Sequence, residues 1–370
     1  MENSYAVDPD ITLAATIDAR FYHDAVAYAL AQERVFARSW QWIGDLGDVA
    51  TAGALSPREL LPGLLNEPLL LARDGTGDLR CLSNVCTHRG NLLVKEPCIA
   101  TQIRCGYHSR RFDLDGRMTF MPEFSTAKNF PSPSDNLPRI PFGQWTNHGF
   151  AAIDPVDKLD SFLAEMSART AWMPIANGVL NHARSRDYVI DAHWALYVEN
   201  YLEGFHVPFV HAALNQVIDV SSDASELYRY ASLQLALANV GDVAFEPPAG
   251  SKDHGQRIAA YYWWIFPNLM LNFYPWGLSL NLVQPEAINR TRVAFRSYVW
   301  DESKLDKGAG AALHQVEMED EAIVEAVQRG TRSRFYRKGR YSPTREMGTH
   351  HFHRLLCEFI NRGQARVGPA

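Results

Sequence analysis

The amino-acid sequence predicts an α+β protein with two domains, a small all-β domain followed by a domain that combines helices with an antiparallel sheet. In the first half, short hydrophobic runs alternate with turns rich in Gly, Pro and Asp, as in small all-β domains. These runs lie at residues 69–71, 102–104 and 112–114. In the second half, turn residues separate four β-rich runs that indicate an antiparallel meander, at residues 258–266, 269–274, 278–283 and 292–300. Helical patterns flank this meander at residues 193–206 and 311–329.

Hydrophobic periodicity and turn composition predict the domain boundaries. Residues 24–39 carry hydrophobic side chains near the helical period, so we expect an N-terminal helical arm at residues 1–39 that packs on the second domain. A Pro-rich stretch at residues 131–141 and a strand pattern after it close the all-β domain, which we expect at residues 40–155. The second domain is then expected at residues 156–370.

The composition argues against several classes of protein. A net charge of -6 gives no support for a polyanionic partner such as nucleic acid. The N-terminus lacks the basic start and apolar run of an export signal, and the most apolar stretch, residues 259–276, is interrupted by Pro267 and Asn268. We therefore expect neither export nor a membrane span. The 5 cysteines do not suggest a disulfide framework in a chain of this length, so a reducing cytoplasm fits best.

Two short motifs each pair a cysteine with a histidine, Cys86-Thr-His88 and Cys105-Gly-Tyr-His108. Together they offer the ligands of a Rieske [2Fe-2S] cluster, in which two cysteines bind one iron and two histidines bind the other. Neutral imidazoles in place of two thiolates raise the reduction potential of such a cluster, which can then accept electrons from a low-potential donor. The sequence therefore predicts a redox protein with a cluster bound by Cys86, His88, Cys105 and His108.

The alternative at these motifs is a structural zinc ion, because two Cys and two His can also bind zinc. Zinc modules usually pair like with like, whereas each motif here mixes the two residue types and is followed by a turn that contains Gly or Ser. A zinc-stabilised binding protein is the competing interpretation, and it predicts a colourless preparation.

A second metal site is expected in the second domain, because a protein that only shuttles electrons would not need a domain of this size. His206 and His211 are the leading candidates. In an uninterrupted helix, positions five apart point about 140° away from each other, which is too divergent to bind one ion. Pro208 cannot donate its amide and clashes with the preceding turn, so we expect the helix to end or bend near Val207 and to bring His211 towards His206.

Two histidines and one carboxylate form the facial triad that binds iron(II) and leaves positions open for oxygen and substrate. On the helix predicted at residues 311–329, Asp320 falls within an apolar stripe of Val316, Ile323, Val324 and Val327. A buried ionised carboxylate is costly unless it is paired or bound to a metal, so we expect Asp320 to be the third ligand. The alternative is an ion pair between Asp320 and a basic residue nearby.

Asn200 and Glu203 share one face of the helix predicted at 193–206 with His206, while an apolar stripe occupies the other face. Such a polar face is usually solvated. Its proximity to His206 changes the expectation, because metal-bound imidazoles commonly donate their second N–H to a carboxylate. We therefore expect Asn200 and Glu203 to belong to the catalytic site.

Taken together, these motifs and the acidic segment at residues 319–330 resemble the catalytic α subunit of Rieske non-haem iron oxygenases over nearly the whole chain. The resemblance implies a β-rich Rieske domain ahead of a helix-grip catalytic domain with an antiparallel sheet, and a ring-shaped homotrimer. It also implies that His108 of one subunit faces the mononuclear iron of its neighbour, linked through the carboxylate at the position of Glu203.

The sequence departs from the family pattern in three places. The linking carboxylate is Glu203 where most of the family has Asp, which is similar to the branch that acts on carnitine, choline and glycine betaine. Thr87 and Gly106 replace the usual prolines, and Ser109-Arg110 replaces a usual Gly-Trp pair. These changes affect the expected cluster potential and donor docking but leave the ligands in place.

The resemblance implies a terminal oxygenase that uses O2 and electrons from NAD(P)H, delivered by a separate reductase or ferredoxin because the chain encodes no nucleotide-binding loop. We expect a small N-methylated or quaternary ammonium substrate and oxidative demethylation. Aromatic residues could form a cage for the cation, and they are Tyr261, Tyr262, Trp263, Trp264, Phe266, Phe273, Tyr274 and Trp276. A pocket for an aromatic ring would use the same residues, so hydroxylation or dioxygenation of a ring or an aromatic acid is the alternative. A non-catalytic Rieske electron carrier is the alternative from another class.

Overall fold

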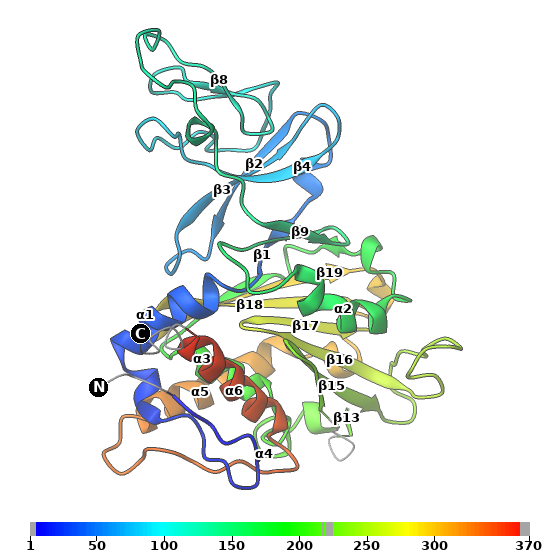
Figure 1. The fold of residues 1–370 in the computed structure, drawn as a ribbon. Coiled ribbons are helices and arrows are strands. Elements are labelled where there is room, and N and C mark those ends of the chain that lie inside the picture. Colours follow the sequence, from blue (N-terminus) through cyan, green and yellow to red (C-terminus); the bar gives the residue numbers. More distant parts are fainter. Residues whose placement is uncertain (1–4, 217, 220–224, 363–370) are drawn as a thin grey trace. The chain divides into compact units, whose positions relative to one another are not determined.

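The computed structural model describes residues 5–216, 218–219 and 225–362. The chain divides into two compact units, one formed by Ala37–Val156 and the other by Met1–Phe36 together with Asp157–Ala370 (Figure 1). The smaller unit is built from strands with short 3-10 turns, and the larger combines an antiparallel sheet with helices. The predicted α+β class is therefore confirmed.

The described residues of the smaller unit form three antiparallel sheets, in the orders β1-β10-β9, β4-β3-β2-β5 and β6-β7-β8. The strands are β1 (Gln41–Asp45), β2 (Ala54–Leu60), β3 (Glu67–Arg73), β4 (Leu79–Ser83), β5 (Cys98–Ile99), β6 (Ile103–Arg104), β7 (Arg111–Phe112), β8 (Met118–Phe120), β9 (Phe142–Trp145) and β10 (His148–Ala151). Two 3-10 turns, η3 (Gly47–Val49) and η4 (Pro133–Asp135), lie in the connections.

Strand β3 separates two hydrophobic clusters of this unit, because successive side chains of a strand point to opposite faces. Leu69 and Leu71 pack in one cluster and Leu70 in the other. The cluster around Leu70 also contains Cys86 and Cys105, which are each 2% exposed. The core of the small unit therefore holds both motif cysteines in place.

The larger unit is organised around one antiparallel sheet in the order β11-β19-β18-β17-β16-β15-β13, with β12 paired to β19 and β14 paired to β15. The predicted meander is confirmed as β16 (Ile258–Ile265), β17 (Leu269–Tyr274), β18 (Gly277–Ala287) and β19 (Arg290–Val299). The sheet is completed by β11 (Val179–Leu180), β12 (Arg186–Ile190), β13 (Ile218–Asp219), β14 (Glu226–Leu227) and β15 (Ala231–Ala238).

Helices surround this sheet, and α3 packs against α5, α6 and strand β18 (Figure 1). The α-helices are α1 (Ala25–Ala31), α2 (Leu159–Thr170), α3 (Trp194–Tyr201), α4 (Val207–Val210), α5 (Leu313–Gly330) and α6 (Met347–Asn361). A π-helical turn, η2 (Gln32–Phe36), continues α1. The 3-10 turns are η1 (Ala19–Tyr22), η5 (Ile175–Asn177), η6 (Leu214–Gln216), η8 (Glu302–Lys304) and η9 (Gly308–Gly310).

The helix predicted at residues 193–206 is shorter than expected, since α3 ends at Tyr201. The chain then changes direction before α4. Pro208 lies in the first turn of α4 and does not end α3. A proline is well tolerated at this position, because the first amides of a helix have no partner within the helix. The histidines are thus brought together by a helix start, and the predicted bend at Pro208 was wrong in its location.

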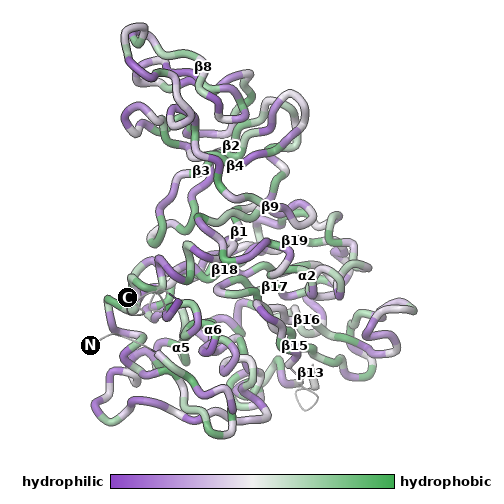
Figure 2. Tube along the Cα trace, viewed as in Figure 1, coloured by the Kyte–Doolittle hydropathy of each residue, from purple (hydrophilic) through white to green (hydrophobic). Residues whose placement is uncertain are grey.

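Hydrophobic and hydrophilic residues alternate over short distances along both units (Figure 2). No helix in the described ranges combines the length and the hydropathy that a membrane-spanning helix needs.

Candidate metal centres and active site

The two Cys/His motifs occupy two turns of the smaller unit. The first turn follows β4 and is closed by the Gly90 amide, which donates to the Cys86 carbonyl at 3.0 Å. The second turn connects β6 and β7 and is closed by the Ser109 amide, which donates to the Cys105 carbonyl at 3.1 Å. Both turns therefore present their side chains from closed backbone loops next to the core.

The four motif side chains separate into a sulfur pair and an imidazole pair. The thiols of Cys86 and Cys105 are near enough for each to influence the pKa of the other, and the rings of His88 and His108 lie 4.8 Å apart between centroids. The Nδ1 atom of His108 is buried and has no hydrogen-bond partner in the described structure. A buried imidazole nitrogen without a partner indicates a missing ligand. Two sulfurs and two imidazoles in separate pairs fit a two-iron cluster whose irons take different ligands.

A single zinc ion fits these motifs less well. A mononuclear ion needs its ligand atoms around one point. Among the described residues, His206, His211 and Asp320 form a group whose ligand atoms all lie within 4.8 Å of one another. The four motif residues, which are also described, do not form such a group.

Hydrogen bonds to Cys105 favour its thiolate. Burial raises the pKa of this thiol, but the Tyr107 amide at 3.5 Å and the Asn91 side-chain amide at 3.6 Å act in the opposite direction, and the pKa is lowered. Thiolates are the form that binds iron.

Asp135 connects the turns that carry the two motifs. Its backbone carbonyl accepts a hydrogen bond from Thr87 at 2.7 Å, and its carboxylate pairs with Arg110 at 2.6 Å. Arg110 is 2% exposed and lies over the rings of Phe112 and Phe130. Two of the departures from the family pattern, Thr87 and Arg110, thus hold the two turns together.

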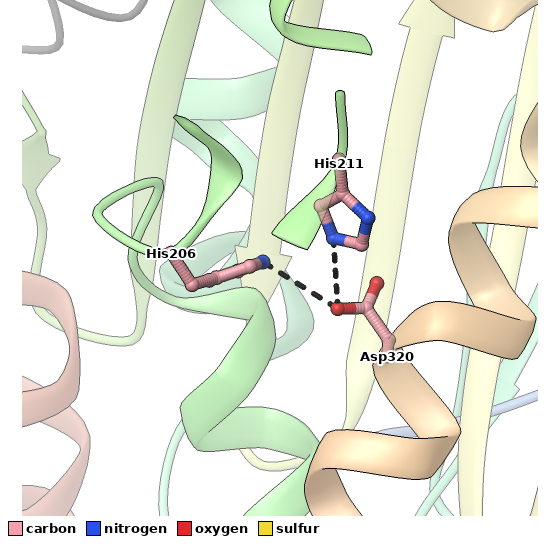
Figure 3. A group of neighbouring side chains, drawn as sticks. All are labelled: His206, His211 and Asp320. Carbon is pink, nitrogen blue, oxygen red and sulfur yellow. Dashed lines mark hydrogen bonds and ion pairs between the residues drawn. The ribbon is translucent and has the colours of Figure 1, made fainter. Parts of the chain in front are cut away.

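His206, His211 and Asp320 form the second candidate centre, in the larger unit (Figure 3). The two histidines flank the four-residue helix α4, and Asp320 lies in the middle of α5. Asp320 Oδ1 is 3.0 Å from His211 Nε2 and 3.4 Å from His206 Nε2. Two imidazole nitrogens and one carboxylate on a common point match the donor set of a non-haem iron(II) site.

Carboxylates hold the far nitrogen of each imidazole. His206 Nδ1 is 2.8 Å from Glu203 Oε1, and His211 Nδ1 is 2.7 Å from Glu319 Oε2. A carboxylate at Nδ1 favours the tautomer whose Nε2 lone pair is free for a metal. Asn200 donates its side-chain amide to Asp320 Oδ1 at 2.6 Å, which orients the carboxylate.

The charges in this group call for a cation at its centre. Burial lowers the pKa of His206, but hydrogen bonds to Asp320 and Glu203 outweigh it and raise the pKa to about 9. Burial acts to raise the pKa of Asp320, but hydrogen bonds with His206 and His211 outweigh burial and lower this pKa. A divalent metal ion bound by the three groups would take the place of the protons that these pKa shifts favour on the imidazoles.

Two sequence expectations about the surrounding helices were wrong. Within the predicted apolar stripe of α5, Val324 is buried, but Ile323 and Val327 are 40% and 44% exposed. The buried face of α5 instead includes Glu317, which accepts the Tyr197 hydroxyl of α3, and Gln328, which accepts the His193 amide. The apolar stripe predicted for residues 193–206 included Tyr197 and Tyr201. These two side chains line the same cavity as Asn200 and Glu203, which were expected on the opposite face.

The cavity beside the candidate iron site has a volume of about 140 Å³. Register in the sheet places Gln234, Tyr262 and Asn272 directly opposite one another on adjacent strands, and all three side chains line the cavity. Of the eight aromatic residues expected to form a cage, Tyr262 and Tyr274 line it. The other six pack elsewhere and are at most 2% exposed. Tyr197, Tyr201 and Phe295 supply further aromatic surface that the sequence did not indicate.

Glu317 and Glu319 are functional candidates that the sequence patterns above did not assign to the site. Both lie on the segment around Asp320, and their proximity to a candidate ligand was the available signal. The directions in which these two side chains point depend on how α5 packs against its neighbours, and local periodicity does not determine that packing.

Comparison with known proteins gives a family match for each of the two parts of the chain. Residues 39–131 match the family model described as Rieske [2Fe-2S] domain, and residues 179–361 match the model described as ring hydroxylating alpha subunit (catalytic domain). The chain is 28% identical over 371 residues to choline monooxygenase, chloroplastic, of Arabidopsis thaliana, across 94% of this chain and 84% of that protein. It is 28% identical over 359 residues to the carnitine monooxygenase oxygenase subunit of Escherichia coli (strain K12), across 93% of this chain and 94% of that protein.

Solved structures share the fold. A quaternary ammonium Rieske monooxygenase in complex with L-carnitine superposes with a TM-score of 0.74 at 21% identity, over 95% of this chain and 97% of that one. Naphthalene 1,2-dioxygenase from Rhodococcus sp. superposes with a TM-score of 0.72 at 17% identity, over 94% of this chain and 95% of that one.

Proposed function

Since the chain belongs to the Rieske non-haem iron oxygenases as a catalytic α subunit, we propose that it is the terminal oxygenase of a system that monooxygenates a quaternary ammonium compound. The family brings two cofactors, a Rieske [2Fe-2S] cluster and a mononuclear iron that uses O2 as co-substrate. Enzymes of this family take their electrons from a separate reductase or ferredoxin, with NAD(P)H as the ultimate source.

We assign the cluster to Cys86, His88, Cys105 and His108. The separate sulfur and imidazole pairs and the partnerless Nδ1 of His108 support this assignment. The cluster domain is then the unit Ala37–Val156.

We assign the mononuclear iron to His206, His211 and Asp320. When bound, the iron supplies the position at which O2 is activated beside the substrate. Asn200 orients the ligand carboxylate, and Glu203 holds the His206 ring and also accepts the His206 amide at 3.0 Å. These two residues act as positioning residues in this assignment.

We further propose the ring-shaped trimer that the resemblance implies, in which His108 of one subunit would face the iron site of the next, and the bound cluster would supply the electrons. Glu203 suits the link between them, because its carboxylate reaches a metal-binding imidazole while its side chain stays 15% exposed. Mass photometry of the purified protein tests the trimer. Replacement of Glu203 by Gln should leave the cluster spectrum unchanged and slow re-oxidation of the reduced cluster in the presence of substrate and O2.

The residues that line the cavity support the substrate assignment. Aromatic side chains attract a quaternary nitrogen, and here they are Tyr197, Tyr201, Tyr262, Tyr274 and Phe295. An apolar cavity of about 150 Å³ is large enough for benzene, so the volume of about 140 Å³ suits a small substrate. The relatives named for choline and carnitine act on small onium compounds of this kind.

The reaction takes up one O2, two electrons and two protons, converts a C–H bond of the substrate into C–OH and releases one water. On an N-methyl carbon, the product is a carbinolamine. Its C–N bond breaks, the nitrogen keeps the electron pair as a tertiary amine, and the carbon leaves as formaldehyde after the hydroxyl proton is lost.

The experiment is a turnover assay with purified protein, reductase, NADH and a panel of onium and aromatic substrates. Formaldehyde released in proportion to NADH oxidised supports N-demethylation. A hydroxylated or aldehyde product from the same onium compound without formaldehyde keeps the monooxygenase but excludes demethylation. A cis-diol or a phenol from an arene, with no product from any onium compound, overturns the proposal.

Oxidation of an aromatic ring is the second candidate, favoured by the family description of residues 179–361 and by the aromatic cavity wall. An aromatic acid is less suited, because no Lys or Arg occurs among the described residues that line the cavity. A non-catalytic electron carrier is disfavoured, since it would have no use for the triad and the cavity beside it.

A further inference from the structure

Glu317 is a buried acid in the wall of the active-site cavity. It lies on α5, three residues before Asp320, and its side chain is 3% exposed. Tyr197 donates its hydroxyl to Glu317 Oε2 at 2.6 Å. The other oxygen, Oε1, is buried and has no hydrogen-bond partner among the described residues. Half of the carboxyl group is therefore without a partner in the wall of the cavity.

No Lys or Arg occurs with this carboxyl group among the described residues that line the cavity. Burial raises the pKa of Glu317 well above its usual range, and the negative charges of Asp320 and Glu321 act in the same direction against the hydrogen bond from Tyr197. Buried acids are normally hydrogen-bonded or paired, so a group in this state is a candidate for an external partner. Glu317 lines the cavity, so a ligand in the cavity would lie beside it.

The rest of the cavity wall tells which kind of ligand fits. Acidic groups are present at Glu203, Glu317 and Asp320, whereas Lys and Arg are absent from the described lining residues. Neutral amides of Gln234, Asn272 and Asn281 provide polar contacts without charge. Tyrosine and phenylalanine rings line the same cavity, at Tyr197, Tyr201, Tyr262, Tyr274 and Phe295.

On the basis of the proposed function, we infer that Glu317 is the counter-ion for the onium nitrogen of the substrate, and that the cavity selects a monocation with a neutral polar tail over a zwitterion. A quaternary nitrogen has no N–H, so it is attracted by charge and by aromatic faces, without hydrogen bonds. A hydroxyl tail finds amide partners in the wall. A carboxylate tail would find no Lys or Arg among the described lining residues and would lose its hydration.

The test is isothermal titration calorimetry of the holoenzyme with its cluster oxidised and no reductant, so that no turnover occurs. The ligands are choline, its neutral carbon isostere 3,3-dimethylbutan-1-ol, and the zwitterion glycine betaine. We expect the wild-type protein to bind choline at least about tenfold more tightly than either of the others, the size of effect that one desolvated ion pair supplies.

The variant is Glu317→Gln, whose side-chain oxygen can still accept the Tyr197 hydroxyl. We expect it to lose about tenfold or more in choline affinity and to leave the affinity for the isostere unchanged, so that the two ligands bind alike. Glu317→Asp keeps the charge and should keep the preference for choline. Glu325→Gln is the matched control, because Glu325 is on the same helix and accepts the Asp191 amide at 3.2 Å, away from the cavity lining.

Three results overturn the inference: equal losses for choline and the isostere in Glu317→Gln, choline affinity within twofold of wild type in that variant, or glycine betaine bound by the wild type as tightly as choline. These are distinct from failure of the proposed function. In that case the wild type would bind no onium compound and would bind an arene.

Discussion

Glu319 offers a quantitative test of the candidate iron site. Its Oε2 atom is 2.7 Å from His211 Nδ1, and its Oε1 atom accepts a hydrogen bond from Gln315 at 3.0 Å. His211 is 1% exposed, and the hydrogen bond from His211 is the largest cause of the lowered pKa of Glu319. Replacement by Ala removes the group that orients His211 and leaves a buried imidazole N–H without its acceptor.

The expected cost follows from this geometry. A carboxylate behind a metal-binding imidazole is worth about 10- to 100-fold in metal affinity. This corresponds to about 1.4 to 2.8 kcal/mol at 1.4 kcal/mol per decade. The Glu319 side chain is 30% exposed, so water can replace part of the lost hydrogen bond, and we expect the lower half of this range. Glu319→Gln keeps a hydrogen-bond acceptor and loses the charge, so its iron affinity should lie between that of Glu319→Ala and that of the wild type.

The assay is competition for iron(II) between the protein and a chelator under anaerobic conditions, with cluster iron measured separately from its visible spectrum. Glu325→Ala is the control, since it removes the same charge from the same helix without contact to His211. The iron assignment is contradicted if Glu319→Ala binds mononuclear iron within twofold of the wild type, or if Glu325→Ala weakens binding equally.

Three further predictions follow from other sites. Asp320→Ala should lose mononuclear iron and oxygenation while the cluster spectrum stays intact, and surviving turnover would contradict the triad. Burial lowers the pKa of His193 to about 3, so the unfolded chain takes up a proton that the folded chain excludes as the pH falls below 6.5. The free energy of unfolding should therefore decrease by about 2 kcal/mol from this residue between pH 8 and pH 5, and His193→Asn, which can still cap α3, should lack this part of the decrease in urea titrations. Asp253→Ala should destabilise the protein by about 3 kcal/mol, because it leaves Arg169, whose side chain is 7% exposed, with only Glu226 as a carboxylate partner. Lys252→Ala, which removes an exposed ion pair with Glu226, is the control in urea titrations. Equal midpoints for the two variants would contradict this prediction.

The parts of the candidate sites that are encoded locally could be read from the sequence. Each Cys/His motif spans three or four residues, so its ligands are close in any fold that forms the turn. His206 and His211 are five residues apart, and the nearby proline indicated a break in the helix. The location of that break was wrong, because α3 ends at Tyr201 and Pro208 starts the next helix.

Residues that depend on helix docking could not be predicted in the same way. The periodicity of α5 placed valines and isoleucine on its buried face, yet Ile323 and Val327 are exposed and Glu317 is buried. Amphipathic periodicity assumes an apolar neighbour. Here the neighbours are the active-site cavity and the face of α3 that carries Tyr197, whose hydroxyl donates to Glu317.

By itself, the sequence determined the chemical types of the ligands, the α+β class and the antiparallel meander, because these depend on residue identity and on contacts between neighbours in the chain. Only the tertiary structure decided that Asp320 meets two histidines more than a hundred residues away in sequence, which carboxylates hold the imidazoles, and that Tyr262 and Tyr274 line the cavity while six other aromatic residues do not. The physical reason is that side-chain direction across a sheet or a helix pair is set by register and docking, and these result from packing of the whole core rather than from any one segment.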